Sequence, residues 1–207
     1  MCGVIGLQNY KKEKNITDLY KLVIESKIRG LHAFGCAFWD KQKKAIICKK
    51  TNIFPTIKFF EDYIKSDSHT LIYHNRYSTS GDWKNQENNQ PITTENISIA
   101  MNGVISMEEK SVFENKYNIK CKSYNDTEII NQLYLKNKNF NFLKELTGSF
   151  AFVALIHDKL YAYRNKFRPL HKFEFKNSVW ICSTADIAQR ALNIKTEELK
   201  PNKIYEF

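Results

Sequence analysis

The chain begins Met1-Cys2-Gly3, which places a thiol one residue from the amino terminus. Removal of Met1 leaves Cys2 carrying the free α-amine of the protein. A thiolate attacks an amide carbonyl, and an α-amine with a pKa of about 8 can carry the proton directly or through one water. Cys2 is therefore a candidate N-terminal nucleophile for acyl transfer. The alternative is a second-residue cysteine without a chemical role, and the rest of the chain has to decide between the two.

Short motifs rich in polar and glycine residues occur along the chain, beginning with the one that contains Cys2. In chain order they are Met1-Cys2-Gly3-Val4-Ile5-Gly6, Arg29-Gly30, His74-Asn75-Arg76-Tyr77-Ser78-Thr79-Ser80-Gly81, Asn88-Asn89-Gln90-Pro91, Asn102-Gly103-Val104-Ile105, Asn125-Asp126-Thr127-Glu128, Arg168-Pro169-Leu170 and Pro201-Asn202. This succession resembles the glutaminase domain of class II glutamine amidotransferases, the N-terminal-nucleophile family. Each motif is short, but six or more in the family's order are not expected by chance.

Different motifs are similar to different branches of that family. The patterns His-x-Arg-Tyr-x-Thr-x-Gly, Asn-x-Gln-Pro and Arg-Pro-Leu resemble the glutamine phosphoribosylpyrophosphate amidotransferase branch. Asn-Gly-Val-Ile and Asp-Thr-Glu also resemble the glucosamine-6-phosphate synthase branch. The resemblance covers nearly the whole chain.

The resemblance implies a complete set of groups for hydrolysing the side-chain amide of glutamine. Cys2 is the nucleophile, and Asn102 with the backbone N–H of Gly103 forms the oxyanion hole. Arg76 binds the α-carboxylate, for which its planar fork is suited, and Asp126 binds the α-ammonium. The structural alternatives are a surface ion pair for Arg76 and a helix N-cap for Asp126. We also predict that Asn102 ends a strand.

Four further positions are support or substrate-proximal residues in the family. They are Arg29, Gly30, Thr79 and Gly81, and of these Arg29 and Thr79 are assigned to substrate binding. Their structural alternatives are a helix C-cap at Arg29-Gly30 and a turn at Gly81. His74 is interpreted as a structural residue at a strand end, because the mechanism has no role left for it.

Three positions depart from the family pattern. His32 stands where relatives usually carry an acidic residue after Arg-Gly, and Met101 precedes Asn102 where histidine is common. Lys200-Pro201-Asn202 replaces the usual glutamate- or proline-glycine pattern. None of these changes removes a reactive group, and the branch within the family stays open.

The composition favours a globular protein without a metal or another cofactor. The five cysteines are scattered and odd in number, with no Cys-x-x-Cys pair, and the five histidines are dispersed. No apolar stretch reaches about 18 residues, and no signal peptide is recognisable. We therefore expect a cytoplasmic protein that has no contact with a membrane.

The formal net charge of +10 raises the question of nucleic-acid binding. The lysines are spread over loops and helix faces and alternate with many asparagines, and no nucleic-acid module is recognisable. A solvated Lys/Asn-rich surface is favoured, and an acidic or nucleic-acid partner is the alternative.

Hydrophobic periodicity predicts the elements that must position these residues. Strands are predicted at 3–9, 33–39, 45–48, 70–73, 97–101, 149–156, 160–163 and 179–182 and near Ile204, and helices at 16–29, 57–64, 109–117, 126–137 and 185–192. The polar stretch 78–96 is predicted to be a long loop. This order indicates an α+β protein, and the resemblance implies the four-layer αββα sandwich of N-terminal-nucleophile hydrolases.

We expect a single glutaminase domain over residues 1–207, with no synthase domain. The expected reaction converts L-glutamine and water to L-glutamate and ammonia through a Cys2 thioester. A separate synthase protein is then needed to accept the ammonia. Two rival hypotheses are a stand-alone N-terminal-nucleophile amidohydrolase acting on another amide and a non-catalytic basic binding subunit with the same fold.

Overall fold

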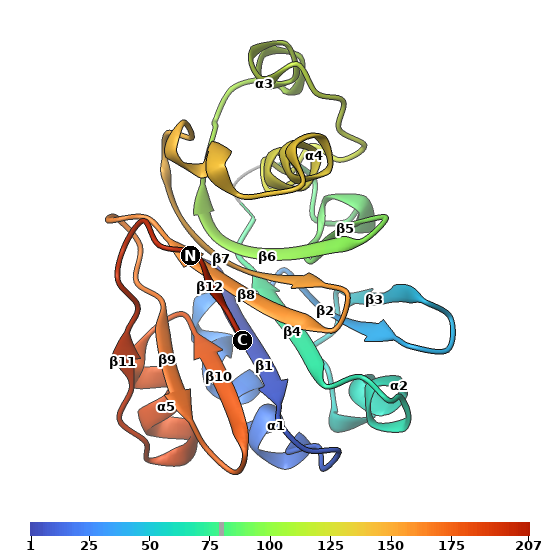
Figure 1. Cartoon of the computed structure of the whole chain (residues 1–207), viewed down its shortest axis with the longest axis vertical. Coiled ribbons are helices and arrows are strands. Elements are labelled where there is room, and N and C mark those ends of the chain that lie inside the picture. The colour runs from blue at the N-terminus through green and yellow to red at the C-terminus, as the bar shows by residue number, and fades with distance from the viewer. Residues whose placement is uncertain (79–80) are drawn as a thin grey trace.

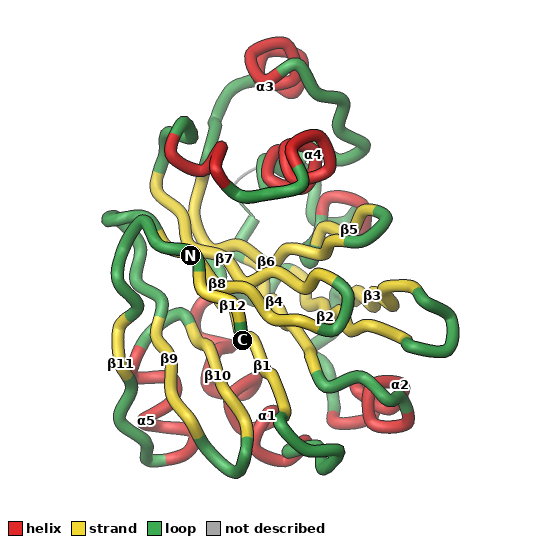
Figure 2. Tube along the Cα trace, in the orientation of Figure 1, coloured by secondary structure: helices red, strands yellow, loops and turns green. Residues whose placement is uncertain are grey.

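The computed structural model describes residues 1–78 and 81–207, and two antiparallel sheets form its centre (Figures 1 and 2). The larger sheet contains, in spatial order, β11 (Glu197–Glu198), β9 (His171–Glu174), β10 (Ser178–Cys182), β1 (Gly3–Asn9), β4 (Thr70–Arg76), β2 (Ala33–Asp40) and β3 (Ala45–Thr51). The smaller sheet contains β12 (Tyr205–Glu206), β8 (Lys159–Arg164), β7 (Ser149–Ile156), β6 (Ile97–Val104) and β5 (Ile92–Thr94).

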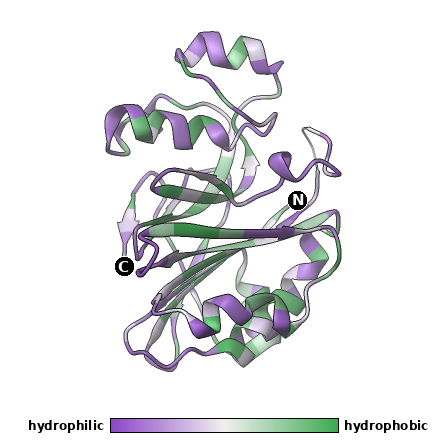
Figure 3. Ribbon diagram, turned by 90° about the vertical axis from the view of Figure 1, so that its right-hand side faces the viewer, coloured by the Kyte–Doolittle hydropathy of each residue, from purple (hydrophilic) through white to green (hydrophobic). Residues whose placement is uncertain are grey.

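Helices cover the outer faces of both sheets, so the expected four-layer αββα order is confirmed (Figure 1). The larger sheet carries α1 (Ile16–Ser26), η1 (Lys27–Arg29), η2 (Ile57–Phe60), α2 (Glu61–Lys65) and α5 (Ala185–Leu192). The smaller sheet carries α3 (Lys110–Tyr117), α4 (Glu128–Asn137) and η4 (Asn141–Lys144). Figure 3 shows the helix ribbons alternating between hydrophilic and hydrophobic residues, as expected of helices with one buried side.

The central strands are apolar on both faces because each sheet is covered twice. In β1, Ile5 and Leu7 face the helix layer, whereas Val4 belongs to the core between the two sheets. A Cβ atom on Gly6 would lie 2.9 Å from a methyl of Leu160, so glycine lets the two sheets approach closely there. Burial on both sides explains the nearly continuous apolar runs of these strands.

The registers of the central strands bring their polar ends together. Gly3 pairs with Asn75 in the antiparallel β1–β4 ladder, so Cys2 lies beside the end of β4 at Arg76. On the facing sheet, Asn102 pairs with Ala151 in the β6–β7 ladder. A contact from the backbone nitrogen of Cys2 to Asn102 joins the two sheets at this edge.

Most predicted elements are confirmed, and the differences occur where tertiary pairing extends or creates a strand. The polar stretch 78–96 is not one long loop, because it contains the short helix η3 (Gln86–Asn88) and strand β5. Strands β9 and β11 were not predicted either. Strand β6 continues to Val104, so Asn102 lies inside a strand and does not end it. The polar sequence Asn102-Gly103 does not itself predict a strand, and pairing with β7 provides the hydrogen-bonded ladder that extends β6 through these residues.

Two observations on the described part of the chain concern membranes and metals. Within residues 1–78 and 81–207, no helix is long and apolar enough to cross a membrane. The same residues contain no group of three or more His, Cys, Asp or Glu side chains placed to hold a metal ion.

Candidate active site

Cys2 lies immediately before β1, at the point where the two sheets meet. Cys2 is 9% exposed, and its Sγ is 3.4 Å from both the backbone nitrogen and the carbonyl oxygen of Tyr77. Arg29 Nε donates to the carbonyl oxygen of Cys2 at 2.8 Å. The next residue is glycine because the side chain of Asn75 occupies the space above it, where a Cβ would lie 2.2 Å from Oδ1. The nucleophile candidate is thus held through its backbone by several elements.

Burial raises the pKa of the Cys2 thiol above its ordinary value. The hydrogen bond from Tyr77, the positive amino terminus and the cationic Arg76 and Arg29 act in the opposite direction. A thiol in this environment needs a nearby group to take its proton before it attacks a carbonyl.

Asn102 uses one side of its amide and keeps the other unpaired. Its Oδ1 accepts a hydrogen bond from the backbone nitrogen of Cys2 at 3.2 Å. Its Nδ2 is buried and has no hydrogen-bond partner among the described residues. A buried amide donor without a partner costs about 1–3 kcal/mol in folding free energy, so its retention beside the thiol points to a role outside folding.

Gly103 follows with a backbone conformation that favours glycine. Its φ angle is +136°, and a Cβ atom would lie 2.1 Å from the carbonyl oxygen of Ser149. The backbone therefore packs directly on β7 at this position. Asn102 and Gly103 are held in a rigid two-strand ladder next to Cys2.

Arg76 is not part of a surface ion pair. The residue is 2% exposed, and its Nη1 donates to Asn89 Oδ1 at 2.6 Å. Its Nη2 donates to the carbonyl oxygen of Gly81 at 3.3 Å. These two hydrogen bonds, both to neutral acceptors, help to orient the guanidinium.

Asp126 is not the N-cap of the helix that follows it. Helix α4 begins at Glu128 with Thr127 as its N-cap residue. The Asp126 carboxylate instead accepts from the backbone nitrogens of Ile105 at 2.6 Å and Ser106 at 3.2 Å, just beyond β6. Burial raises the pKa of Asp126 to about 6, against the effect of these hydrogen bonds and of Arg76.

The segment Asn88-Asn89-Gln90 connects the site residues. It belongs to one of the sequence motifs, but the sequence alone predicts no role for it. Besides the contact of Asn89 with Arg76, Gln90 Oε1 accepts from the backbone nitrogen of Met101 at 2.5 Å. Asn88 Oδ1 accepts from the backbone nitrogen of Tyr124 at 2.8 Å, and Asn125 Nδ2 donates to the Asn88 carbonyl at 2.9 Å. These buried amides hold the end of β4, strand β6 and the turn before Asp126 in one network.

The remaining predicted residues lie around this network or outside the described chain. Arg29 contacts Cys2, as described above, and Gly30 lies where a Cβ would be 2.4 Å from the carbonyl carbon of Arg76. Thr79 falls outside the described residues. His74 is fully buried inside β4, where burial lowers its pKa to about 3 and the neutral ring donates from Nε2 to the Met101 carbonyl at 3.1 Å.

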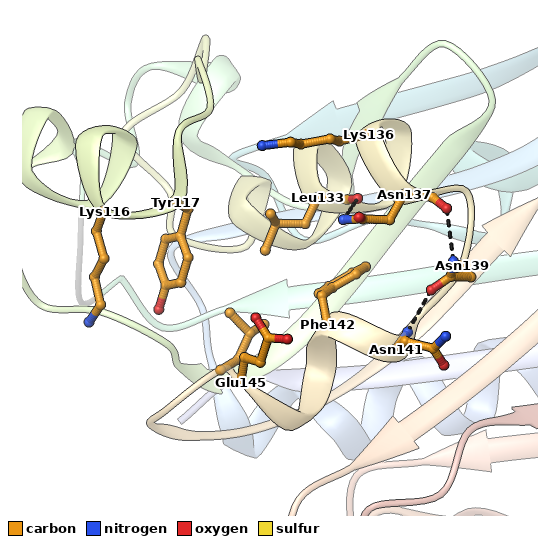
Figure 4. A pocket seen from close by; sticks show the side chains of 10 residues that line it. Lys116, Tyr117, Leu133, Lys136, Asn137, Asn139, Asn141, Phe142 and Glu145 are labelled. Carbon is orange, nitrogen blue, oxygen red and sulfur yellow. Dashed lines mark hydrogen bonds between the residues drawn. The ribbon is translucent and has the colours of Figure 1, made fainter.

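A separate cavity of about 430 Å³ lies between α3, α4 and η4, away from these residues (Figure 4). Its lining includes Lys116, Tyr117, Leu133, Lys136 and Phe142. It contains none of the predicted site residues, and it is formed on the outer side of the smaller sheet.

The αββα layers and the thiol at the junction of the sheets define a protein with the fold of N-terminal-nucleophile hydrolases. Two solved structures have this fold over 99% of the chain. They are the glutamine phosphoribosylpyrophosphate amidotransferase of B. subtilis in complex with ADP and GMP (TM-score 0.72, 18% identity) and an allosteric regulatory enzyme of purine biosynthesis (TM-score 0.71, 21% identity). The chain spans about half of their length, with 47% and 46% covered.

A third solved structure is covered almost completely. It is the glutamine aminotransferase class-II domain protein of Silicibacter pomeroyi (TM-score 0.56, 11% identity), with 99% of this chain and 94% of that chain aligned. No curated protein sequence matches the chain.

The model of the glutamine amidotransferase domain matches residues 74–189, more than half of the chain, and the chain therefore belongs to this family. The recognition made from the motifs is confirmed. The matched range includes Arg76, Asn102, Gly103 and Asp126 and begins after Cys2.

Proposed function

We propose that the protein hydrolyses L-glutamine to L-glutamate and ammonia with Cys2 as an N-terminal nucleophile. The observation that carries the proposal is the buried, unpaired Nδ2 of Asn102, whose Oδ1 is 3.2 Å from the nitrogen of Cys2. An amide held beside a thiol with its N–H groups unsatisfied is suited to bind the oxygen that becomes negative when the thiolate attacks a carbonyl.

In the proposed first step, the α-amine of the processed chain takes the thiol proton, and Sγ bonds to the carbonyl carbon, Cδ, of the glutamine side-chain amide. The carbonyl oxygen becomes an oxyanion that receives hydrogen bonds from Asn102 Nδ2 and the Gly103 N–H. The amine then returns the proton to the leaving nitrogen, the C–N bond breaks and ammonia departs, which leaves a thioester on Cys2. Water attacks the thioester in the same way and releases glutamate.

The amino-acid end of glutamine is proposed to lie between Arg76 and Asp126. Arg76 is buried, and the planar fork of its guanidinium is suited to bidentate pairing with a carboxylate. Asp126 is a buried acid just beyond the end of β6, and a substrate ammonium would supply the cation that its ionised form needs. Arg29 and Thr79 complete the proposed substrate-proximal set.

Two measurements test the nucleophile directly. The intact mass of active protein should lack Met1 and any acetyl group. A glutamine-like electrophile such as diazo-oxo-norleucine should add one equivalent at Cys2. The other four cysteines provide the internal control: burial raises the pKa of Cys36, Cys48, Cys121 and Cys182, and none of them carries the amino terminus as Cys2 does after processing. Active protein that retains Met1, or labelling at another cysteine, would contradict the proposal.

We further propose that a separate, nucleotide-using synthase consumes the ammonia and that the isolated chain is a slow glutaminase. A glutaminase that was fully active without its partner would release ammonia to solution, where no acceptor would incorporate it. The net charge of +10 favours an acidic docking face on the synthase, so stimulation should weaken as salt rises. Glutamate release is to be measured with and without the co-purified synthase and its substrate. A fast rate that no partner alters would favour the stand-alone hydrolase.

A further inference from the structure

His32 departs from the family pattern, and it hydrogen-bonds to the backbone segment 76–78 that also contacts the Cys2 thiol. The His32 backbone nitrogen donates to the carbonyl oxygen of Arg76 at 3.0 Å. The His32 ring accepts at Nδ1 from the backbone nitrogen of Ser78 at 2.9 Å. His32 therefore holds the backbone on both sides of Tyr77.

The opposite edges of the same two peptide groups face Cys2. The N–H of Tyr77 belongs to the peptide whose carbonyl His32 binds, and it donates to Cys2 Sγ at 3.4 Å. The carbonyl of Tyr77 belongs to the peptide whose N–H the His32 ring binds, and it accepts from Cys2 Sγ at 3.4 Å. Because the N–H and C=O of a trans peptide point in opposite directions, holding one edge sets the direction of the other.

The ring of His32 is itself held by stacking. It lies between Tyr77 and Trp83, with ring centroids 5.1 Å and 5.6 Å away and interplanar angles of 25° and 20°. Gly30 packs against the Arg76–Tyr77 peptide itself, since a Cβ there would lie within 2.6 Å of its atoms. The acceptor nitrogen consequently has a defined position relative to the backbone of Ser78.

We propose that His32 is a positioning residue for the Cys2 thiol, acting through the Tyr77–Ser78 peptide that its Nδ1 orients. This inference rests on the proposed role of Cys2 as the nucleophile. The Tyr77 N–H is the hydrogen bond that favours the thiolate against burial. The His32 ring anchors the peptide after Tyr77 and the His32 backbone nitrogen anchors the peptide before it, so Tyr77 is fixed from both sides with its N–H directed at Sγ. An aromatic ring without an acceptor releases the second of these anchors.

The test is the rate at which iodoacetamide alkylates Cys2, followed by mass spectrometry of its peptide between pH 7 and 10 without glutamine. His32→Phe keeps an aromatic ring and loses the acceptor, whereas His32→Asn and His32→Asp keep an acceptor and lose the ring. Trp83→Leu is the matched control, because it removes a stacking partner and leaves the acceptor in place. The other charged groups acting on the thiol are the amino terminus, Arg29 and Arg76, and no variant alters them.

We expect His32→Phe to react roughly fivefold more slowly at pH 7.5, equivalent to a rise of about 0.7 unit in the midpoint of the pH–rate curve. His32→Asn and Trp83→Leu should stay near the wild-type midpoint, whereas the carboxylate of His32→Asp adds a negative charge near the thiol and raises the midpoint for that separate reason. An unchanged midpoint in His32→Phe overturns the proposal, and so does an equal rise in His32→Asn. Thermal unfolding curves identify any variant that fails to fold, and the comparison of His32→Asn with the wild type then carries the test.

Failure of this inference is distinguishable from failure of the proposed reaction. Alkylation reads the thiol without any substrate, so a protein that turns over no glutamine still reports on His32. In an active protein, His32→Phe should lower kcat more than it raises KM, because the thiol and not the glutamine anchor is displaced.

Discussion

The two ends of the paired strands β1 and β4 contain similar polar residues but treat them differently. At the end away from Cys2, Asn9 donates to Tyr63 Oη at 2.6 Å and to the His69 carbonyl at 3.0 Å, and accepts from Ser178 Oγ at 2.9 Å. At the Cys2 end, His74 Nδ1 and Asn75 Oδ1, together with Asn102 Nδ2 on the facing strand β6, are buried without hydrogen-bond partners among the described residues.

The difference separates an end whose buried amide is fully hydrogen-bonded from an end that leaves several buried polar atoms unpaired, among them the amide that we propose to act on the substrate. A satisfied buried amide stabilises the folded state by about 1 kcal/mol per hydrogen bond, and an unsatisfied one destabilises it. The hydrogen bonds at the Asn9 end therefore raise the free energy of unfolding, and the unpaired buried atoms at the Cys2 end lower it. Substitutions at the two ends should separate activity from stability.

Cys2→Ala should have the largest kinetic effect of any single change. We expect glutamine turnover to fall at least about 10⁴-fold, because the reaction loses its nucleophile. The thermal midpoint should stay close to that of the wild type, since the thiol is a small part of the core. Steady-state glutamate release and a thermal melt measure the two quantities, and residual turnover near the wild-type level would remove the chemical role from this end of the strands.

Asn102→Ala should lower kcat by about 10²–10³-fold with little change in KM, because an oxyanion donor acts chiefly in the transition state. Stability should change little, because the variant removes an unsatisfied donor together with the acceptor of the Cys2 nitrogen. Kinetics over a range of glutamine concentrations separate kcat from KM. Full kcat in folded protein would show that the unpaired Nδ2 has another cause.

Asp126→Asn should raise KM for glutamine by roughly 30-fold, the loss expected for one hydrogen bond to a charged group. The wild-type KM should itself rise as pH falls through about 6, where the buried acid takes up a proton. In Asp126→Asn this pH dependence should disappear. A variant that keeps both the low KM and its pH dependence would exclude Asp126 as the ammonium anchor.

The same substitution should stabilise the protein at pH 8. The pKa of Asp126 is raised on folding, so its ionised form destabilises the folded state above about pH 6, and the penalty is absent below about pH 4. The gain from Asp126→Asn is expected to be about 2–3 kcal/mol in unfolding free energy at pH 8 and to vanish on acidification. Denaturant titrations at pH 4 and pH 8 measure it.

Asn9→Ala should have the smallest effect on catalysis and a clear effect on stability. It leaves Tyr63 Oη, the His69 carbonyl and Ser178 Oγ without their shared partner. We expect a loss of about 2 kcal/mol in unfolding free energy, or roughly 5 °C in melting temperature, and an unchanged kcat per folded molecule. A large kinetic defect here would mean that the two ends are coupled.

Local sequence was sufficient for the elements with strong periodicity. Helix α5 and strand β7 have the predicted limits because their apolar spacing is regular over eight residues each. Strands β5, β9 and β11 are short, and β9 and β11 carry charged residues, so only their sheet neighbours make them strands. The same reason explains β6, which continues through Asn102 and Gly103.

The order of the motifs determined the family, the fold class and the candidate residues from sequence alone, because residue types and their succession are properties of the chain. The tertiary structure alone decided three further features. The Nδ2 of Asn102 stays unpaired, Asp126 binds backbone nitrogens and does not cap a helix, and His32 binds the backbone segment that contacts the thiol. These features join residues up to 100 positions apart through strand register and burial, and no local pattern encodes such contacts.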